Sequence, residues 1–225
     1  MKKGKIIFAI VTLGLSFYFA LAITKSVFNK KEIALKVTQN TDLENIKDGD
    51  MIFQTSQSAQ CEAVRIATNS KFSHCGIIFV MNGKKMVFEA VQPVKLTRIK
   101  DWITHGKDNK YVVKRLKNAQ TILTQTTLQK MKDYGHNFLN KDYDGYFSWN
   151  DDQIYCSELV WKIYKNAANI ELCKLAKLKS FNLSNEKVKV ILAERYGKNI
   201  PLEEDVVAPS QIVDSEILET IFDNY

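Results

Sequence analysis

The spacing of apolar residues changes several times along the chain, and each spacing predicts a different element. Short apolar runs predict strands, and they occur at residues 51–53, 75–81, 85–91 and 111–116. Asn82-Gly83 separates the second run from the third. Asn-Gly between β-rich runs is a strong hairpin signal, because both residues tolerate the positive φ of a type I′ turn. The second and third strands are therefore expected to pair as an antiparallel hairpin.

Apolar residues at helical spacing predict helices over residues 58–68, 124–140, 156–168 and 185–195, and again near the C-terminus. Residues 141–153 are polar and aromatic and predict a loop. No repeat or low-complexity segment interrupts the pattern. It predicts one α+β domain over residues 46–225, with an antiparallel sheet packed against helices, preceded by a polar connector at residues 25–45.

Residues 1–24 are typical of an export signal or a membrane anchor. Lys2, Lys3 and Lys5 precede residues 6–23, which carry no charge, and Ala20-Leu21-Ala22 offers the small residues that a signal peptidase requires. The same run is barely long enough to span a hydrocarbon core of about 30 Å. We therefore expect an exported protein. It would be periplasmic or extracytoplasmic after cleavage of a signal peptide, or membrane-associated through a retained anchor.

The net charge of +7 arises almost entirely at the N-terminus. Residues 1–31 contain six lysines and no acidic residue, which leaves only +1 for the rest of the chain. A nucleic-acid-binding protein concentrates cationic side chains where phosphates lie. The body of this chain has no comparable excess, so we expect no nucleic-acid partner.

Four cysteines, Cys61, Cys75, Cys156 and Cys173, are enough for two disulfides in an exported chain. No cysteines or histidines stand at metal-ligand spacing, so we expect no metal site and no cofactor. A domain of this size folds without disulfides. We therefore interpret Cys61, Cys75 and Cys173 as buried small residues and leave their disulfide state open.

Cys156 is the candidate nucleophile because it begins a predicted amphipathic helix. Unpaired N–H groups at a helix N-terminus favour a thiolate over a thiol, and they can also stabilise the oxyanion of a tetrahedral intermediate. Ser157 is the nearest competing nucleophile, but no GxSxG motif surrounds it. The alternative interpretation of Cys156 is a buried small residue.

His74 is the candidate base among three histidines, because it begins a predicted strand. His136 lies within a predicted helix and His105 in a turn-like stretch, so both are interpreted as structural or solvated.

The predicted hairpin also supplies His74 with a partner. A turn centred on Asn82-Gly83 pairs residues whose numbers sum to 165, which places Gly76 opposite Glu89 and makes Glu89 the diagonal neighbour of His74. A carboxylate among apolar residues needs a partner. Glu89 is therefore predicted to orient the His74 imidazole and stabilise its cation; a purely structural contact is the alternative.

With these residues in place, the sequence resembles the YiiX/YebB-like proteins, a branch of the NlpC-type cysteine hydrolase superfamily. The resemblance covers roughly residues 46–222. It lies in short blocks at residues 49–53, 67–77, 87–90 and 143–144, in Tyr155-Cys156-Ser157-Glu158-Leu159-Val160-Trp161, and in Ala208-Pro209-Ser210.

The resemblance implies a circularly permuted papain-like fold, in which the histidine strand precedes the cysteine helix. It implies Cys156 as nucleophile, His74 as base and Glu89 as the third, orienting residue, and it places Tyr155 at the oxyanion site or the substrate pocket. Several relatives use histidine as the third residue. Relatives also divide between cleaving amide bonds in cell-wall peptides and moving acyl chains on lipids.

The resulting prediction is an exported cysteine hydrolase that cleaves an amide bond, in a cell-wall-type peptide, through a Cys156 thioester. Its partner would be a small peptide or acyl substrate. The alternatives are a lipid acyltransferase or thioesterase of the same fold and a non-catalytic ligand-binding module. The sequence does not predict the oligomeric state.

Overall fold

The computed structural model describes residue 25 and residues 43–225 of the chain. Contacts divide the chain into two units, Met1–Asn45 and Ile46–Tyr225. The predicted export segment and nearly all of the predicted connector lie outside the described residues. Within the described part, no helix has the length and apolar character needed to cross a membrane.

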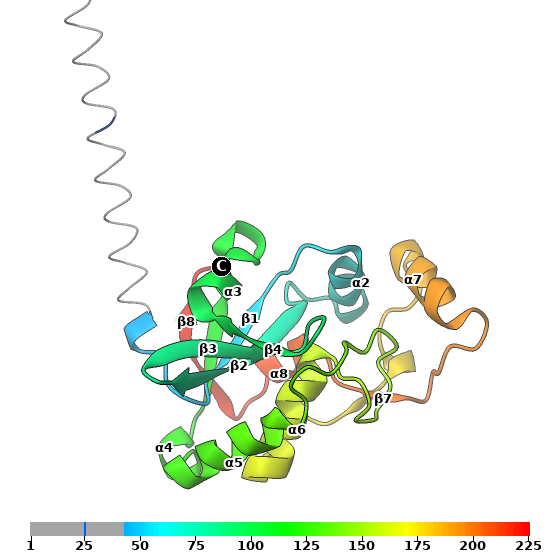
Figure 1. Ribbon diagram of the computed structural model, residues 1–225. Coiled ribbons are helices and arrows are strands. Elements are labelled where there is room, and N and C mark those ends of the chain that lie inside the picture. Colours follow the sequence, from blue (N-terminus) through cyan, green and yellow to red (C-terminus); the bar gives the residue numbers. More distant parts are fainter. Residues whose placement is uncertain (1–24, 26–42) are drawn as a thin grey trace, which may run out of the picture. The chain divides into compact units, whose positions relative to one another are not determined.

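The second unit is built on a six-stranded sheet in which every neighbouring pair is antiparallel (Figure 1). The strand order is β4-β3-β2-β1-β5-β8. The strands are β1 Met51–Gln54, β2 His74–Met81, β3 Lys84–Glu89, β4 Lys95–Arg98, β5 Val112–Leu116 and β8 Leu218–Asp223. A small second sheet pairs β6 Ala176–Lys177 with β7 Asp205–Val206.

The β2–β3 hairpin has the predicted register. Asn82 and Gly83 form its turn with φ values of 50° and 72°, which is the positive-φ pair expected of a type I′ turn. Ile77 lies opposite Phe88, so the residue numbers sum to 165 as predicted. β3 ends at Glu89, two residues earlier than expected, because the chain bends at residues 91–93 and returns as the next strand of the sheet, with Lys95 opposite Glu89.

Each predicted helix is present, and the elements that were not predicted are short. The helices are α2 Ala59–Thr68, α3 Ile99–Thr104, α4 Ala119–Ile122, α5 Gln125–His136, α6 Cys156–Ala168, α7 Glu186–Tyr196 and α8 Pro209–Val213. Residues 107–109 and 178–180 form short 3-10 helices. The prediction missed α3, α4, β4 and the β6–β7 pair. Near the C-terminus it anticipated a helix, which corresponds to α8, but the chain then ends in strand β8.

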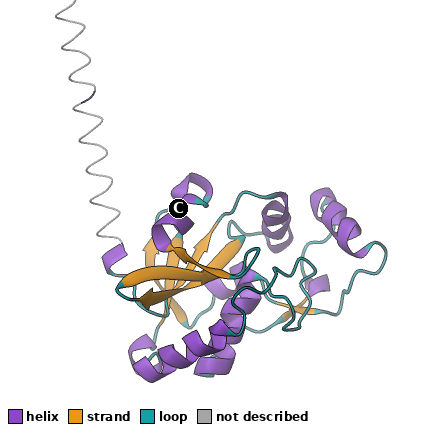
Figure 2. Cartoon of the chain, in the orientation of Figure 1, coloured by secondary structure: helices purple, strands orange, loops and turns teal. Residues whose placement is uncertain are grey.

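The core lies between the sheet and helices α5 and α6. Figure 2 distinguishes the strands of the sheet from the helices that pack on it. Helix α6 buries Leu159 and Ile163 against strand residues that include Cys75, Ile77 and Phe88. Burial of aliphatic and aromatic side chains of this size contributes about 1.5–3 kcal/mol each. Helix α3 packs against β3 and β4. Helix α6 contacts β2, so the strand that begins with His74 packs directly against the helix that begins with Cys156.

Candidate active site

Cys156 is the first residue of α6 and is 5% exposed. Tyr155 caps the helix in an extended conformation, with φ −104° and ψ 167°. The N–H groups of the first helical turn have no partner one turn earlier, so this end of α6 carries partial positive charge. The predicted position of Cys156 at a helix N-terminus is confirmed.

His74 and Glu89 are in direct contact, with 2.6 Å between His74 Nε2 and Glu89 Oε2. The other carboxylate oxygen, Oε1, accepts a hydrogen bond from Thr97 Oγ1 at 2.5 Å. Trp102 Nε1 donates to Oε2 at 2.8 Å, and the Trp102 ring stacks on the imidazole of His74 with 5.8 Å between centroids. The predicted His74–Glu89 pair is thus present and further fixed by two neighbours.

The carboxylate of Glu89 is held ionised although it is 2% exposed. Burial raises its pKa, but the hydrogen bonds and charge of His74 and the hydrogen bonds from Thr97 and Trp102 outweigh burial and lower the pKa below its usual value. Glu89 is therefore an anion that can stabilise a positive charge on His74.

His74 contacts Glu89 through Nε2, which leaves Nδ1 as the nitrogen that can interact with Cys156. Burial lowers the pKa of His74, but hydrogen bonds to Cys156 and Glu89 outweigh it and raise the pKa to about 10. The pKa of Cys156 is shifted well below its usual value. Its largest cause is a hydrogen bond from the Cys75 thiol; burial opposes the shift, and the hydrogen bond and charge of His74 add to it. These directions favour a thiolate–imidazolium pair.

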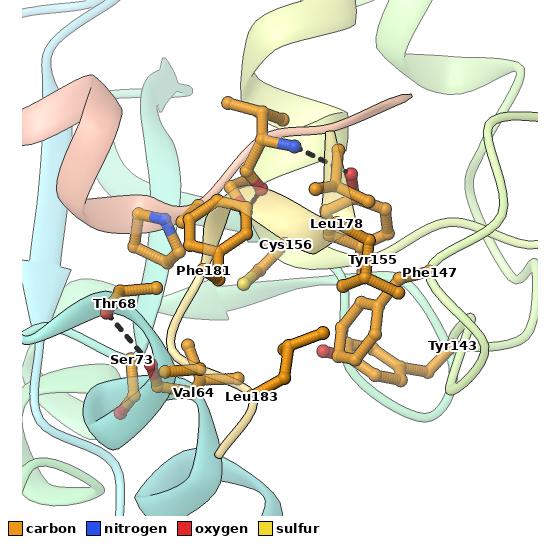
Figure 3. Close-up of a pocket in the computed structure, with 16 residues that line it drawn as sticks. Val64, Thr68, Ser73, Tyr143, Phe147, Tyr155, Cys156, Leu178, Phe181 and Leu183 are labelled. Atoms are coloured by element: carbon orange, nitrogen blue, oxygen red, sulfur yellow. Dashed lines mark hydrogen bonds between the residues drawn. The ribbon is translucent and has the colours of Figure 1, made fainter. Parts of the chain in front are cut away.

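Cys156 opens into a pocket with a cavity volume of about 90 Å³. Figure 3 shows its sulfur directed into the space beside Phe181 and Leu183. Helix α2, the loop at residues 143–147, residues 178–183 and residues 206–209 supply the walls. Most lining side chains are apolar, and apart from the Cys156 thiolate none is charged. The pocket is suited to an apolar group placed next to the nucleophile.

Tyr155 and Ser157 lie beside Cys156 and line the same pocket. The Tyr155 hydroxyl accepts a hydrogen bond from the Val207 N–H at 3.1 Å, so this side chain ties the start of α6 to the pocket wall. Ser157 Oγ donates to the Val207 carbonyl at 2.7 Å and is buried, which makes Ser157 a structural residue. An oxyanion role for Tyr155 stays a prediction.

The remaining histidines and cysteines lie elsewhere. His105 and His136 are exposed, as expected. Cys75 is buried, as expected, whereas Cys61 and Cys173 are only partly buried, so the interpretation of these two as buried was wrong. All four cysteines are free thiols.

Sequence reasoning missed Thr97, Trp102 and Cys75 as parts of this site. Thr97 and Trp102 belong to β4 and α3, whose short length gave no periodicity signal. Cys75 follows the base directly in the sequence, and that adjacency was the one signal available.

Comparison with known proteins shows the family of this chain. The family model of permuted papain-like amidases, the YaeF/YiiX or C92 family, matches residues 45–222. The chain belongs to this family. Its fold is accordingly the circularly permuted papain-like α+β fold, with the His74 strand before the Cys156 helix, and its family is one of amide hydrolases.

Two relatives illustrate the similarity. The chain is 47% identical over 173 residues to the uncharacterized protein YiiX of Escherichia coli strain K12, covering 77% of this chain and 84% of that protein. It also matches the crystal structure of YiiX from Escherichia coli O157:H7, with a TM-score of 0.77 and 46% identity, covering 80% of this chain and 99% of that one. That structure is titled a metalloprotein. Over residue 25 and residues 43–225 of the present chain, no three His, Cys, Asp or Glu residues are grouped to hold a metal ion.

Proposed function

We propose that this protein is a cysteine hydrolase that cleaves an amide bond through a thioester on Cys156. The observation that carries the proposal is the arrangement of three groups. Cys156 lies at the N-terminus of α6, interaction with His74 helps to lower the pKa of its thiol, and His74 Nε2 is 2.6 Å from the buried carboxylate of Glu89. This is the nucleophile, base and orienting group of a thiol hydrolase.

In the first half of the reaction, the Cys156 thiolate attacks the carbonyl carbon and forms the carbon–sulfur bond. The oxyanion of the tetrahedral intermediate accepts hydrogen bonds from N–H groups at the start of α6. The His74 imidazolium then gives its proton to the departing amine, the carbon–nitrogen bond breaks, and an acyl thioester remains on Cys156.

In the second half, neutral His74 takes a proton from water as the water oxygen attacks the thioester. The carbon–sulfur bond breaks, the carboxylic acid leaves, and the thiolate–imidazolium pair is restored. Glu89 stays ionised throughout and stabilises each state in which His74 is charged.

A cell-wall-type peptide is the substrate expected from the sequence, and the family supports an amide bond. A murein peptide carries carboxylates and amines, and burying a charge without a partner is costly. Since no charged side chain other than the Cys156 thiolate lines the pocket, a peptide substrate would have to keep its charged groups outside it.

The apolar pocket favours a second candidate, in which the acyl part of the substrate is hydrophobic. The same chemistry would then remove an acyl chain from a lipid, or pass it to another acceptor as an acyltransferase or thioesterase. Export, or anchoring through residues 1–24, is part of both proposals and is supported by the lysine-flanked apolar run.

The test is a mass measurement on the purified full-length chain after incubation with muropeptides and, separately, with acyl lipids. An acyl adduct on Cys156 identifies the nucleophile and the substrate class together. Product formation should be lost in Cys156→Ala and retained in Cys61→Ala and Cys173→Ala, since both of these cysteines lie outside the site.

Product formation that persists in Cys156→Ala would refute the thioester mechanism. Ligand binding without turnover, unchanged in Cys156→Ala, would instead favour the non-catalytic binding module. Acyl transfer with lipids and no reaction with muropeptides would replace the peptide substrate by the lipid one.

A further inference from the structure

The apolar pocket beside Cys156 contains five side-chain hydroxyl groups. Four of them are hydrogen-bonded to backbone groups, namely those of Thr68, Ser73, Tyr155 and Ser157. The fifth belongs to Tyr143, whose oxygen lies 2.9 Å from Nε2 of the Gln60 side chain. Tyr143 therefore differs from the other four in being bonded to a side chain.

Arg195 fixes the direction of the Gln60 side chain. Nη2 of Arg195 donates to Oε1 of Gln60 at 2.7 Å. Arginine has no acceptor, so the amide atom that faces it must be the oxygen, and the atom that faces Tyr143 must be the NH2 group, which can only donate. The Tyr143 oxygen therefore accepts a hydrogen bond from Gln60, and its own hydrogen has to point elsewhere.

The hydrogen of the Tyr143 hydroxyl is available to a bound molecule. Tyr143 lines the pocket, and Figure 3 shows its hydroxyl directed towards Leu183, another lining residue. Over residue 25 and residues 43–225, the structure gives no acceptor for this hydrogen. Burial raises the pKa of the Tyr143 hydroxyl well above its usual value, so the group stays protonated at neutral pH.

Tyr143 is also held in a fixed position. It lies in the loop before α6, where its N–H donates to Gln92 Oε1 at 2.7 Å. Its side-chain partner Gln60 belongs to α2, and Arg195 belongs to α7. Three segments of the chain thus order this hydroxyl before any ligand binds, which lowers the entropy cost of using it.

We propose that Tyr143 is a substrate-binding residue, whose O–H donates a hydrogen bond to an amide carbonyl oxygen in the acyl group of the substrate. The proposal rests on the proposed function, because it takes Cys156 as the nucleophile that receives this acyl group. It also narrows the substrate class. The acyl group would be apolar and uncharged but peptide-like, as in an N-acylated apolar amino acid.

The pocket walls and the hydroxyl together favour this class of acyl group. A ligand pocket is mostly apolar and contains a few placed polar groups that fix the orientation of the ligand. A plain alkyl chain would cover the Tyr143 hydroxyl and leave its hydrogen without an acceptor, which is unfavourable. An amide carbonyl supplies that acceptor and brings no charge into the pocket.

The test compares two p-nitrophenyl esters on the purified full-length chain. One is the ester of N-acetyl-leucine, and in the other an isobutyl group replaces the acetamido group, so that size is kept and the carbonyl is lost. The measured quantity is the ratio of the two kcat/KM values. The intrinsic reactivity of each ester is the same for every variant, so a change in this ratio reports on the pocket.

Tyr143→Phe removes the hydroxyl and keeps the ring. We expect kcat/KM for the N-acetyl-leucine ester to fall by about 2- to 10-fold, the effect of one neutral hydrogen bond. The value for the isobutyl analogue should stay the same or rise. Tyr196→Phe is the matched control, since it removes a tyrosine hydroxyl outside the pocket and should leave the ratio unchanged.

Gln60→Glu tests the same hydrogen without removing the hydroxyl. A carboxylate at this position still accepts from Arg195, but its second oxygen accepts from Tyr143 and draws the hydrogen away from the pocket. The ratio should therefore fall as it does in Tyr143→Phe, although the ring and the hydroxyl are both present. If urea denaturation shows that Tyr143→Phe does not fold, Gln60→Glu decides alone.

An unchanged ratio in folded Tyr143→Phe or in Gln60→Glu would overturn the proposal. An equal fall for both esters would also overturn it, because the hydroxyl would then act on a step common to both substrates. Failure of the proposed function gives a different result. In that case Cys156→Ala still hydrolyses the esters, whatever the ratio in the Tyr143 variant.

Discussion

Replacing Glu89 by Gln removes one buried charge and leaves the shape of the site almost unchanged. The Gln carbonyl oxygen can take the place of Oε2, which accepts from His74 and Trp102, and the amide nitrogen can donate to the Thr97 hydroxyl in place of Oε1. The substitution therefore isolates the electrostatic part of the His74–Glu89 contact. We expect it to lower both the pKa of His74 and the rate.

The size of the effect follows from the 2.6 Å contact. A hydrogen bond to a charged group contributes about 1.5–3 kcal/mol, against about 1 kcal/mol for a neutral one. Gln keeps a neutral hydrogen bond, so the loss is about 0.5–2 kcal/mol. Each factor of ten in rate corresponds to about 1.4 kcal/mol, which predicts a roughly 2- to 30-fold fall in kcat/KM. The pKa of His74, raised to about 10 in the wild type, should fall at the same time.

Two measurements check this expectation: kcat/KM on whichever amide or ester the enzyme turns over, and the rate of Cys156 alkylation against pH. Urea denaturation of the same samples separates an effect on the site from an effect on folding. Thr97→Val is the matched control, because it removes a hydrogen bond to Glu89 Oε1 but keeps the charge beside His74. Because this hydrogen bond goes to a charged group, its loss should lower the free energy of unfolding by about 1.5–3 kcal/mol. It should change the rate much less than Glu89→Gln does.

The reasoning would be refuted by a folded Glu89→Gln variant with wild-type kcat/KM and an unshifted alkylation profile. Such a result would reduce Glu89 to a structural partner of His74. A Thr97→Val variant as slow as Glu89→Gln would also contradict it, since geometry rather than charge would then control the rate.

Three further predictions follow from single contacts. Gly76→Ala would place a Cβ 2.6 Å from Val87 Cγ1. This overpacking should lower the free energy of unfolding, measured in urea, by about 1–3 kcal/mol. An unfolding midpoint equal to that of the wild type would contradict the close approach of the strands. Tyr155→Phe removes the acceptor for the Val207 N–H. We expect the free energy of unfolding to fall by about 1–3 kcal/mol in the same assay. A variant as stable as the wild type would show that this N–H has another partner. The pKa of His74 in the folded protein is near 10, above its usual 6.5. The contribution of His74 to stability is therefore fully present below pH 6.5 and is lost as the pH rises towards 10. The hydrolysis rate should fall over the alkaline end of this window, and a rate still rising above pH 10 would exclude an imidazolium as the acid.

The His74–Glu89 pair could be predicted because a two-residue turn fixes the register of a hairpin. Once Asn82-Gly83 is identified as the turn, paired residues are those whose numbers sum to 165. Side chains alternate between the two faces of a strand, so the register also decides which residues share a face. The structure confirms this register. Only the end of β3 was misplaced, since the bend after Ala90 has no counterpart in the apolar pattern.

The groups that support Glu89 could not be predicted in the same way. Thr97 lies on an edge strand of four residues and Trp102 on a helix of six, both too short to show a period. Their contacts with Glu89 depend on how the chain packs back against β3 after this strand ends. That packing depends on burial of Ile99, Trp102 and Ile103.

The substrate pocket is even harder to predict from the sequence than the groups around Glu89. Its walls come from α2, from the loop before α6 and from residues 178–183 and 206–209, which meet only in the folded domain. The apolar character of each segment predicts burial, and a pocket wall is built from the same residue types as a core. The chemistry at Cys156 could therefore be anticipated, whereas the nature of the group beside it could not.

In this permuted chain, the residues that orient the base and the residues that form the pocket lie in different parts of the sequence. All the side chains that orient the base, Glu89, Thr97 and Trp102, lie within thirty residues of His74 in the sequence, on the neighbouring strands and α3. Most of the pocket wall comes from residues 143–209, on the side of the chain that also carries Cys156. Substitutions around the base should therefore act on kcat and on the pH profile, because they change the charge and position of His74. Substitutions between residues 178 and 209 should act on the choice of acyl group, because they change what fits beside the sulfur without touching the proton transfer.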